Sequence, residues 1–166
     1  MQSSNRKNIP YTFKVVNDKS INAFAIPGGY CYVNLGLIDL AENEAELASV
    51  ISHEIAHVVG EHGMENMTKQ QIIGFAGAVI LGGRPTLTEE IISSIIQRGV
   101  LTNFSRGAEL EADRLGIEQM HAAGIDPIGF ESFLKKMRDK EKGESSGFSN
   151  MLSTHPPTDL RIKKSF

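Results

Sequence analysis

The sequence has little cysteine, little excess charge and no long apolar run, and each shortage excludes a class of protein or partner. Cys31 is the single cysteine among 166 residues, so the chain can form neither an internal disulfide nor a cysteine-based zinc site. A formal net charge of −3 gives no indication of nucleic-acid binding. The longest apolar stretch, Ile72 to Gly83, is shorter than the roughly 20 residues that a bilayer-spanning helix needs. We therefore expect no nucleic-acid partner and no transmembrane segment in this chain.

The amino terminus also lacks the apolar core of a signal peptide. Residues 1–10 are mostly polar and predict a disordered tail. The remaining length suits one domain with its own hydrophobic core, so residues 1–166 are predicted to form a single domain. The abrupt start and end suggest a domain excised from a longer protein. A lost leader would place the native protein in the periplasm, although the chain as given is expected to be soluble.

Hydrophobic patterning and turn residues predict an α+β fold, mostly helical, with a small antiparallel sheet beside one long helix. Strands are expected at residues 11–16, 22–26 and 30–35, the last two forming a hairpin around Pro27-Gly28-Gly29. Cys31 lies in the third strand and is interpreted as a buried structural thiol. Helices are expected at residues 43–68, 70–82, 88–100 and 127–142. A further helix is expected to begin at a cap, Asn103 or Ser105, and to end near residue 122. Residues 143–150 are expected to form a flexible loop.

The most informative residues are His53-Glu54-Ile55-Ala56-His57. On a helix the two histidines are spaced i, i+4 and lie about 40° apart around the axis, so both imidazoles can reach one metal ion. Glu54 would project beside the metal, where it can accept a proton from water. This pattern supplies two ligands and the general base of a metalloprotease. A surface helix with two solvated histidines is the plain alternative, but the apolar residues around the motif argue against it.

A third ligand must come from elsewhere, and Glu109 is the candidate. A catalytic zinc usually has three protein ligands and keeps its fourth position for water. Glu109 and Asp113 are again spaced i, i+4, so Glu109 could bind zinc while Asp113 accepts a hydrogen bond from a ligand imidazole. Glu111 points to another face and is expected to be solvated. For this pair considered alone, an ordinary acidic helix surface would be the better interpretation.

The remaining histidines carry less information by themselves. His62 follows the point at which the metal-facing side of the helix has rotated away, and His121 lies where a helix dipole favours a cation. Both are predicted to face solvent. His155, which precedes two prolines, would be interpreted as a loop residue if nothing else were known.

Three motifs in order resemble one family of peptidases. They are the His53–His57 motif, Ser105-Arg106-x-x-Glu109-x-Glu111-Ala112-Asp113, and Ser153-Thr154-His155-Pro156-Pro157-Thr158-x-x-Arg161-Ile162. Together they resemble the zinc metallopeptidases that include the CAAX prenyl protease and HtpX. These are gluzincins, in which two histidines and a glutamate hold zinc in a zincin-like domain. The resemblance covers about residues 20–164, and among the branches it is greatest to the BepA-type and Oma-type proteases.

The resemblance implies one zinc ion per chain and assigns the residues around it. The ligands would be His53, His57 and Glu109, with Glu54 as the general base that activates water and returns the proton to the leaving amine.

The resemblance also implies roles for residues around the ligands. His155 would act in the mechanism, either as a fourth ligand that closes the site or as a stabiliser of the oxyanion, and Asp113 would be structural. Arg161 has two open roles, oxyanion stabilisation or pairing with Asp113 or another buried carboxylate. Arg106 is expected to play a similar structural part.

The family pattern places an edge strand for the substrate at Asn22-Ala23-Phe24-Ala25. An extended polypeptide can add to such an edge through main-chain hydrogen bonds while pockets bind alternate side chains. The alternative is a hairpin that packs the core and contacts no substrate.

We therefore predict a zinc metalloendopeptidase that hydrolyses polypeptides in protein quality control, periplasmic or membrane-associated in its full-length form. A zinc-bearing, chaperone-like binding module with weak or latent proteolysis is the competing hypothesis. The intact ligand set and Glu54 favour the enzyme. A membrane-embedded prenyl-peptide protease is disfavoured because the chain has no apolar span of sufficient length.

Overall fold

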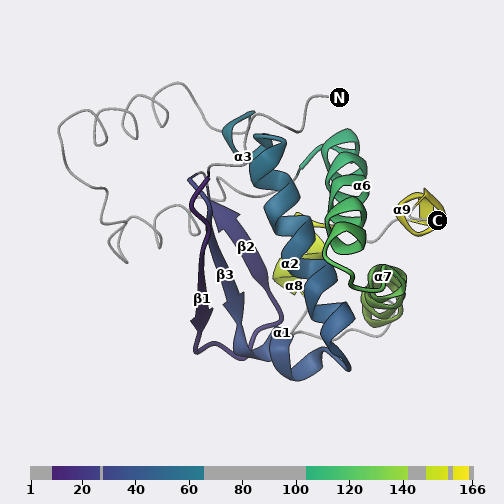
Figure 1. Cartoon of the computed structure of the whole chain (residues 1–166). Coiled ribbons are helices and arrows are strands. Elements are labelled where there is room, and N and C mark those ends of the chain that lie inside the picture. Colours follow the sequence, from purple (N-terminus) through teal and green to yellow (C-terminus); the bar gives the residue numbers. More distant parts are fainter. Residues whose placement is uncertain (1–8, 27, 66–103, 142–148, 157–158, 165–166) are drawn as a thin grey trace.

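A computed structural model describes residues 9–26, 28–65, 104–141, 149–156 and 159–164. Its elements form an α+β fold in which helices predominate, as the sequence predicts (Figure 1). The elements in chain order are β1 (Thr12–Val16), β2 (Ala23–Ile26), β3 (Tyr30–Asn34), α1 (Leu35–Leu40), α2 (Glu44–Val59), α3 (His62–Glu65), α6 (Arg106–Ala122), α7 (Ile128–Glu141), α8 (Ser149–Thr154) and α9 (Asp159–Lys164). The helices expected at 70–82 and 88–100, and the tail at 1–8, lie outside the described residues.

The sheet is mixed and not purely antiparallel, which corrects one detail of the prediction. Its strand order is β1-β3-β2, with β2 antiparallel and β1 parallel to β3. The glycines at 28 and 29 form the β2–β3 turn, where their φ angles of 100° and 88° favour glycine. β1 and β2 run in opposite directions, as strands joined by a short connection do, but β3 inserts between them. The hairpin pattern alone could not predict this insertion.

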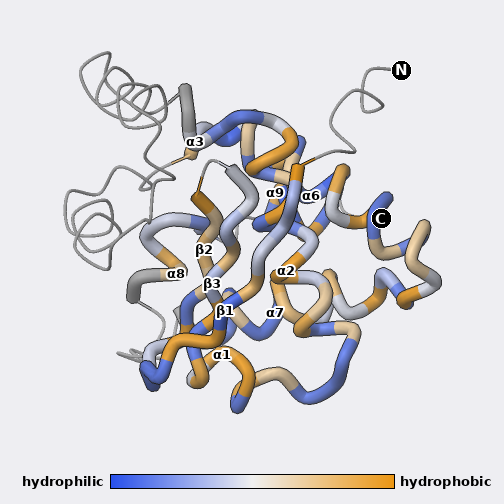
Figure 2. The backbone as a smooth tube through the Cα atoms, turned by 60° about the vertical axis from the view of Figure 1, so that its left-hand side comes forward, coloured by the Kyte–Doolittle hydropathy of each residue, from blue (hydrophilic) through white to orange (hydrophobic). Residues whose placement is uncertain are grey.

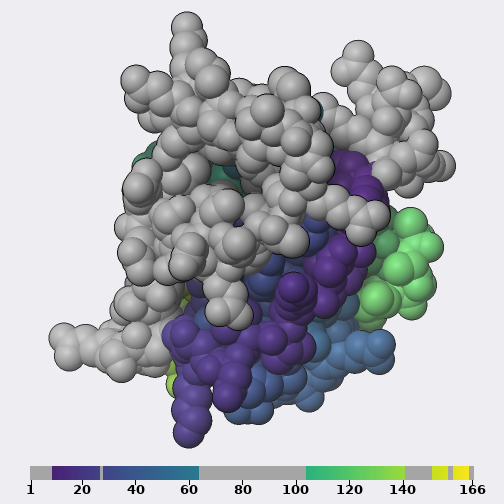
Figure 3. Space-filling model, turned by 90° about the vertical axis from the view of Figure 1, so that its left-hand side faces the viewer, coloured from purple at the N-terminus to yellow at the C-terminus, as the bar shows by residue number. Residues whose placement is uncertain are grey.

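The two edges of the sheet face different surroundings. β1 is largely exposed, with Phe13 and Val15 on the surface, and its purple atoms are visible in Figure 3. β2 is the other edge among the described strands, and it packs against α2. Figure 1 shows α2 between the sheet on one side and α6 and α7 on the other. The central position of α2 explains why its residues dominate the site described below.

Helix α2 begins where the sequence predicts and ends earlier. The Asn43 side chain caps it by accepting a hydrogen bond from the Glu46 N–H at 2.9 Å. The helix ends at Val59 and not near residue 68, because Gly60 is the C-cap and Glu61 adopts a positive φ of 58°. The short helix α3 follows. A second difference is α1, which begins at Leu35, a residue assigned to the third strand from the sequence.

Helices α6 and α7 pack against α2 and begin near the predicted positions. Ser105 caps α6 by accepting a hydrogen bond from the Ala108 N–H at 3.1 Å. Gly116 allows a close crossing, because a Cβ atom there would lie 3.2 Å from the backbone nitrogen of His53. The end of the predicted loop at 143–150 is instead helical, since α8 begins at Ser149.

The hydrophobic core lies between the sheet and the helices. Apolar residues recur along α1 and α2, drawn in orange in Figure 2. Cys31 is buried in β3, as predicted, and burial raises the pKa of its thiol to about 12. The largest core cluster consists of Ala23, Val33, Leu37, Val50, Phe133, Met137 and Met151. None of the described helices combines the length and apolar character needed to cross a bilayer.

Candidate metal centre

Four buried side chains from three segments converge on one point. His53 and His57 come from α2, Glu109 from α6, and His155 from the residue after α8, with one ligand atom of each within 4.8 Å of the others. The Nε2 atoms of His53 and His57 are 3.0 Å apart. Glu109 Oε1 lies 3.3 Å from His57 Nε2 and 2.9 Å from His155 Nδ1. The sequence motifs thus meet in space, including the distant His155.

The donor atoms fit a metal ion because their lone pairs face one another. His53 Nδ1 lies 3.0 Å from Asp113 Oδ1, so Nδ1 carries a hydrogen and Nε2 is the nitrogen that could bind a metal ion after losing its proton. His57 Nδ1 has a partner of its own at 2.9 Å, the Nδ1 of His62, which leaves its Nε2 free to act as a ligand. Two imidazole nitrogens 3.0 Å apart need either a hydrogen or a metal ion between them. Two imidazoles and a carboxylate are the ligands that catalytic zinc uses.

The charges of the surrounding residues also favour a bound cation. Arg161 is buried and holds Asp113 with two hydrogen bonds, from Nε at 2.8 Å and from Nη2 at 2.7 Å. Its Nη1 lies 2.7 Å from Glu109 Oε2. Burial raises the pKa of Glu109, but the neighbouring imidazoles outweigh burial and hold that pKa well below its usual range. Burial likewise raises the pKa of Asp113, but Arg161 and His53 outweigh burial and hold that pKa below its usual value. Both carboxylates are therefore ionised, so a second positive charge beside Arg161 is needed to balance them, either a protonated His53 or a bound cation.

His53 and His57 have opposite affinities for protons when no metal is bound. Burial lowers the pKa of His57 to about 2, so it is neutral. Burial also lowers the pKa of His53, but hydrogen bonds with Asp113 and Glu109 outweigh it and raise that pKa to about 9. Metal binding must therefore displace a proton from His53, as it does from many ligands.

Glu54 lies beside the cluster and does not belong to it. Its Oε2 accepts a hydrogen bond from the backbone N–H of Ala25 at 3.1 Å, which fixes the carboxylate against β2. Its Oε1 is buried without a hydrogen bond among the described residues and lies 3.4 Å from His155 Nε2. Burial raises the pKa of Glu54, which makes this carboxylate a better proton acceptor than an exposed one.

The predicted site residues do not all lie at the cluster. Arg161 pairs with Asp113, the second of the two roles that the sequence left open. Arg106 is exposed at the first position of α6, so a structural part like that of Arg161 is not supported. His121 is exposed as predicted, and the side chain of Glu111 is half exposed.

The prediction that His62 faces solvent is wrong. His62 is buried and contacts His57, because the chain turns sharply after Val59 and does not continue the helix. The sequence contained one indication of this turn, the glycine at position 60, which flanks His62.

Sequence reasoning also missed Phe104. Its ring stacks on His57, with centroids 4.0 Å apart, and on His155, with centroids 5.4 Å apart. It thus packs between a helix residue and the His155 segment. Phe104 lies just before the α6 cap and belongs to no periodic pattern, so nothing in the sequence indicated this position.

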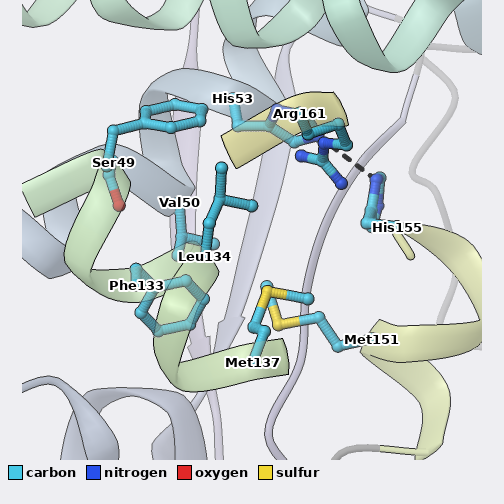
Figure 4. Close-up of a pocket in the computed structure, with 10 residues that line it drawn as sticks. Ser49, Val50, His53, Phe133, Leu134, Met137, Met151, His155 and Arg161 are labelled. Atoms are coloured by element: carbon cyan, nitrogen blue, oxygen red, sulfur yellow. Dashed lines mark hydrogen bonds between the residues drawn. The ribbon is translucent and has the colours of Figure 1, made fainter. Parts of the chain in front are cut away.

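A small apolar cavity of about 20 Å³ adjoins the cluster (Figure 4). Figure 4 shows His53, Arg161 and His155 along one side, with a hydrogen bond of 3.2 Å between His53 Nε2 and His155 Nδ1. The apolar lining comes from α2, α7 and α8 and consists of Val50, Phe130, Phe133, Leu134, Met137 and Met151. On the side of this cavity the His155 segment faces methionines and Leu134, while Arg161 Nη1 donates to the Pro156 carbonyl at 3.1 Å.

Comparison with known proteins places this arrangement in context. The chain matches Peptidase family M48 over residues 1–165. It is 35% identical to the beta-barrel assembly-enhancing protease of Yersinia pestis over 96% of this chain and 35% of the relative. It is 30% identical to the mitochondrial metalloendopeptidase OMA1 of Schizosaccharomyces pombe over 97% of this chain and 47% of the relative. The chain thus spans between about a third and a half of the length of these relatives.

Proposed function

Because the chain belongs to peptidase family M48, which confirms the resemblance seen in its motifs, we propose that it is the catalytic domain of a zinc metalloendopeptidase. One observation carries the proposal: a buried set of metal-ligating atoms lies beside a separate buried carboxylate, Glu54, that is not part of the set. We assign His53, His57 and Glu109 as ligands of one zinc ion per chain, and residues 1–166 as a single domain.

A bound zinc ion would polarise the scissile carbonyl and lower the pKa of the attacking water. Glu54 accepts the proton of that water through Oε1, the oxygen without a hydrogen bond, while the Ala25 N–H holds Oε2. The protonated carboxyl then donates to the amine of the leaving peptide. Asp113 holds the tautomer and orientation of His53.

We assign His155 as a residue that closes the resting site. Its Nδ1 lies 3.2 Å from His53 Nε2 and 2.9 Å from Glu109 Oε1, which is the position of a further ligand. Its Nε2 lies 3.4 Å from Glu54 Oε1, where an attacking water would have to be. A histidine in this position excludes water from both the metal and the base. The role of oxyanion stabiliser would require His155 to move away from the cluster first.

Chelation and ligand removal test the metal assignment. We expect one zinc per chain, loss of caseinolytic activity with a chelator, and recovery when zinc is restored. Alanine at His53, His57 or Glu109 should each weaken zinc binding strongly, because each change removes one of the three proposed ligands and His155 alone cannot replace it while closing the site. Elemental analysis with circular dichroism measures both metal and fold, and Glu118→Ala, on an exposed part of α6, is the matched control. Full zinc occupancy in folded Glu109→Ala would exclude Glu109 as a ligand.

We further propose that the substrate adds to the edge strand Asn22-Ala23-Phe24-Ala25. Ala25 N–H points to Glu54 and not to β3, so the N–H groups of alternate residues on this strand point away from β3. The Ala23 N–H therefore points to the same side as that of Ala25, and because Ala23 is buried it would meet a substrate only once this edge is uncovered. A peptide paired along this edge would pass Glu54 with its backbone extended.

Ala23→Pro tests the strand directly. Proline removes the N–H that would pair with the substrate, so KM should rise roughly 3- to 10-fold, as expected for about one hydrogen bond. Zinc content and kcat should change little, because Ala25 still holds Glu54. Since Ala23 is buried, thermal melting must accompany the kinetics. Phe24→Pro, which breaks the pairing with β3 instead, should destabilise the fold. An unchanged KM in folded Ala23→Pro would refute strand addition.

The competing function, a zinc-bearing binding module with latent proteolysis, draws support from the position of His155. A site closed by its own histidine would bind partners without cutting them. Substitution of His155 by alanine distinguishes the two functions, because a site that is only plugged should cut once the histidine is gone.

The relatives suggest a setting for the proposed activity. One is named for β-barrel assembly and another as a mitochondrial endopeptidase. We propose that polypeptides are the substrates, that the role is protein quality control, and that the full-length protein is periplasmic or membrane-associated.

A further inference from the structure

His62 is a buried histidine that the proposed mechanism does not use. Its ring is 4% exposed and lies between the ligand His57 and the surface residue Glu111. We propose that His62 is a positioning residue for His57, and that Glu111 fixes the tautomer in which His62 does so. The inference rests on the proposed metal site, because it assigns a role relative to one of its ligands.

The polarity of the hydrogen bonds follows from the ligand role of His57. If His57 Nε2 faces the metal, its Nδ1 carries the hydrogen and donates to His62 Nδ1 at 2.9 Å. His62 Nδ1 must then be the lone-pair nitrogen, so the hydrogen of His62 lies on Nε2. That nitrogen is 3.5 Å from Glu111 Oε2, a carboxylate that can accept it. Each of the three side chains, His57, His62 and Glu111, therefore has one donor or acceptor assignment that agrees with the other two.

The backbone after α2 is shaped to bring His62 into this position. Glu61 adopts a positive φ of 58°, a backbone conformation that residues other than glycine rarely adopt. A Cβ atom on Gly60 would lie 2.5 Å from His62 Nε2 and 2.6 Å from His62 Cε1. The imidazole therefore folds back over residue 60 onto the last turn of α2. A positive φ after the C-cap is a common way to end a helix, but ending the helix does not require the close approach of the His62 ring to residue 60.

The two ligand histidines of α2 are thus held in different ways. Asp113 accepts directly from His53, whereas a carboxylate reaches His57 through an interposed imidazole. Phe104 stacks on the face of the His57 ring, and His62 contacts its edge. Stacking limits rotation of the ring about its Cβ–Cγ bond but does not select a tautomer, and the hydrogen bond to His62 does. Partners of this kind fix the tautomer and orientation of a ligand histidine, and their loss weakens metal binding.

Zinc affinity of the full chain, measured by competition with a chromophoric chelator, tests the proposal. His62→Leu should weaken zinc binding roughly 10- to 100-fold, the usual effect of losing such a partner. His62→Asn should recover part of the loss, because its Oδ1 can occupy the place of Nδ1 and accept from His57. Gly60→Ala should resemble His62→Leu, since the added methyl displaces the ring while every polar group remains. His121→Leu, at an exposed histidine, is the matched control and should bind zinc as the parent does.

A spectroscopic measurement on the unmodified protein removes any dependence on how the variants fold. Long-range ¹⁵N–¹H correlation spectra of the zinc-loaded chain should show the hydrogen of His57 on Nδ1 and that of His62 on Nε2. The cobalt-substituted protein should change its visible spectrum in His62→Leu and less so in His62→Asn. A hydrogen on His62 Nδ1, or equal zinc affinity in the parent and folded His62→Leu, would overturn the proposal. Equal losses of zinc affinity in His62→Leu and His62→Asn would also overturn it.

Failure of the proposed function would look different. If the parent binds zinc with the tautomers described but cleaves no peptide, the assignment of His62 stands and the peptidase proposal fails. If folded Glu109→Ala keeps its zinc, the ligand set itself is wrong, whatever His62 does.

Discussion

Glu54→Gln is expected to lower kcat by about 10²- to 10⁴-fold, the usual cost of removing a general base. The amide keeps an oxygen that can accept the Ala25 N–H, so the side chain should remain in place against β2. It cannot accept the proton of the attacking water. Because Glu54 is not one of the converging ligand atoms, zinc content should be unchanged. Turnover of a quenched peptide, with elemental analysis of the same sample, measures both quantities.

The stability of the Gln variant provides an independent check on the same residue. Burial raises the pKa of Glu54, which means that the folded protein disfavours the charged carboxylate relative to the unfolded chain. A neutral amide of the same shape avoids that cost, so the melting temperature of the metal-free variant should be equal to or higher than that of the parent. Glu118→Gln, at an exposed glutamate, should change neither stability nor turnover. Wild-type cleavage by Glu54→Gln would refute the mechanism.

The sequence predicted which residues come together at the candidate site because the spacing of a helix is periodic. His53 with His57, and Glu109 with Asp113, are each one turn apart, and the structure places both pairs on facing sides of α2 and α6. The caps at Asn43 and Ser105 were also predictable, since a side-chain oxygen before a helix has a local partner. These features depend on residues close together in the chain.

The features that the sequence did not reveal depend on tertiary contacts. Phe104 stacks on two imidazoles that are 47 and 51 positions away, and no periodic pattern encodes such a contact. His62 was assigned to solvent by continuing an ideal helix past Gly60, whereas the chain turns there and buries the ring. The insertion of β3 between β1 and β2 is of the same kind. A periodic pattern indicates that a helix or strand continues, but it does not show at which residue tertiary packing makes the element end.

His155→Ala is expected to raise peptidase activity, because the parent histidine occupies the positions that water and substrate need. Its Nδ1 lies among the ligand atoms and its Nε2 faces Glu54. The apolar cavity beneath it, lined in part by Met137 and Met151, provides little that would hold the ring rigidly. If the open form is about a tenth of the parent molecules, removing the plug should raise the rate roughly tenfold.

The opposite result has an equally definite cause. If His155 stabilises the oxyanion, its loss should reduce kcat by about 10²- to 10³-fold, as for other donors of that type. A hydroxamate peptide separates the two roles without turnover, since it must reach the metal to bind. The plug predicts tighter hydroxamate binding in His155→Ala, with zinc and fold retained, and no change in the His121→Ala control at an exposed histidine. A folded, zinc-loaded His155→Ala that is less active than the parent and binds hydroxamate no better would eliminate the plug, because an obstruction cannot be removed without opening the site.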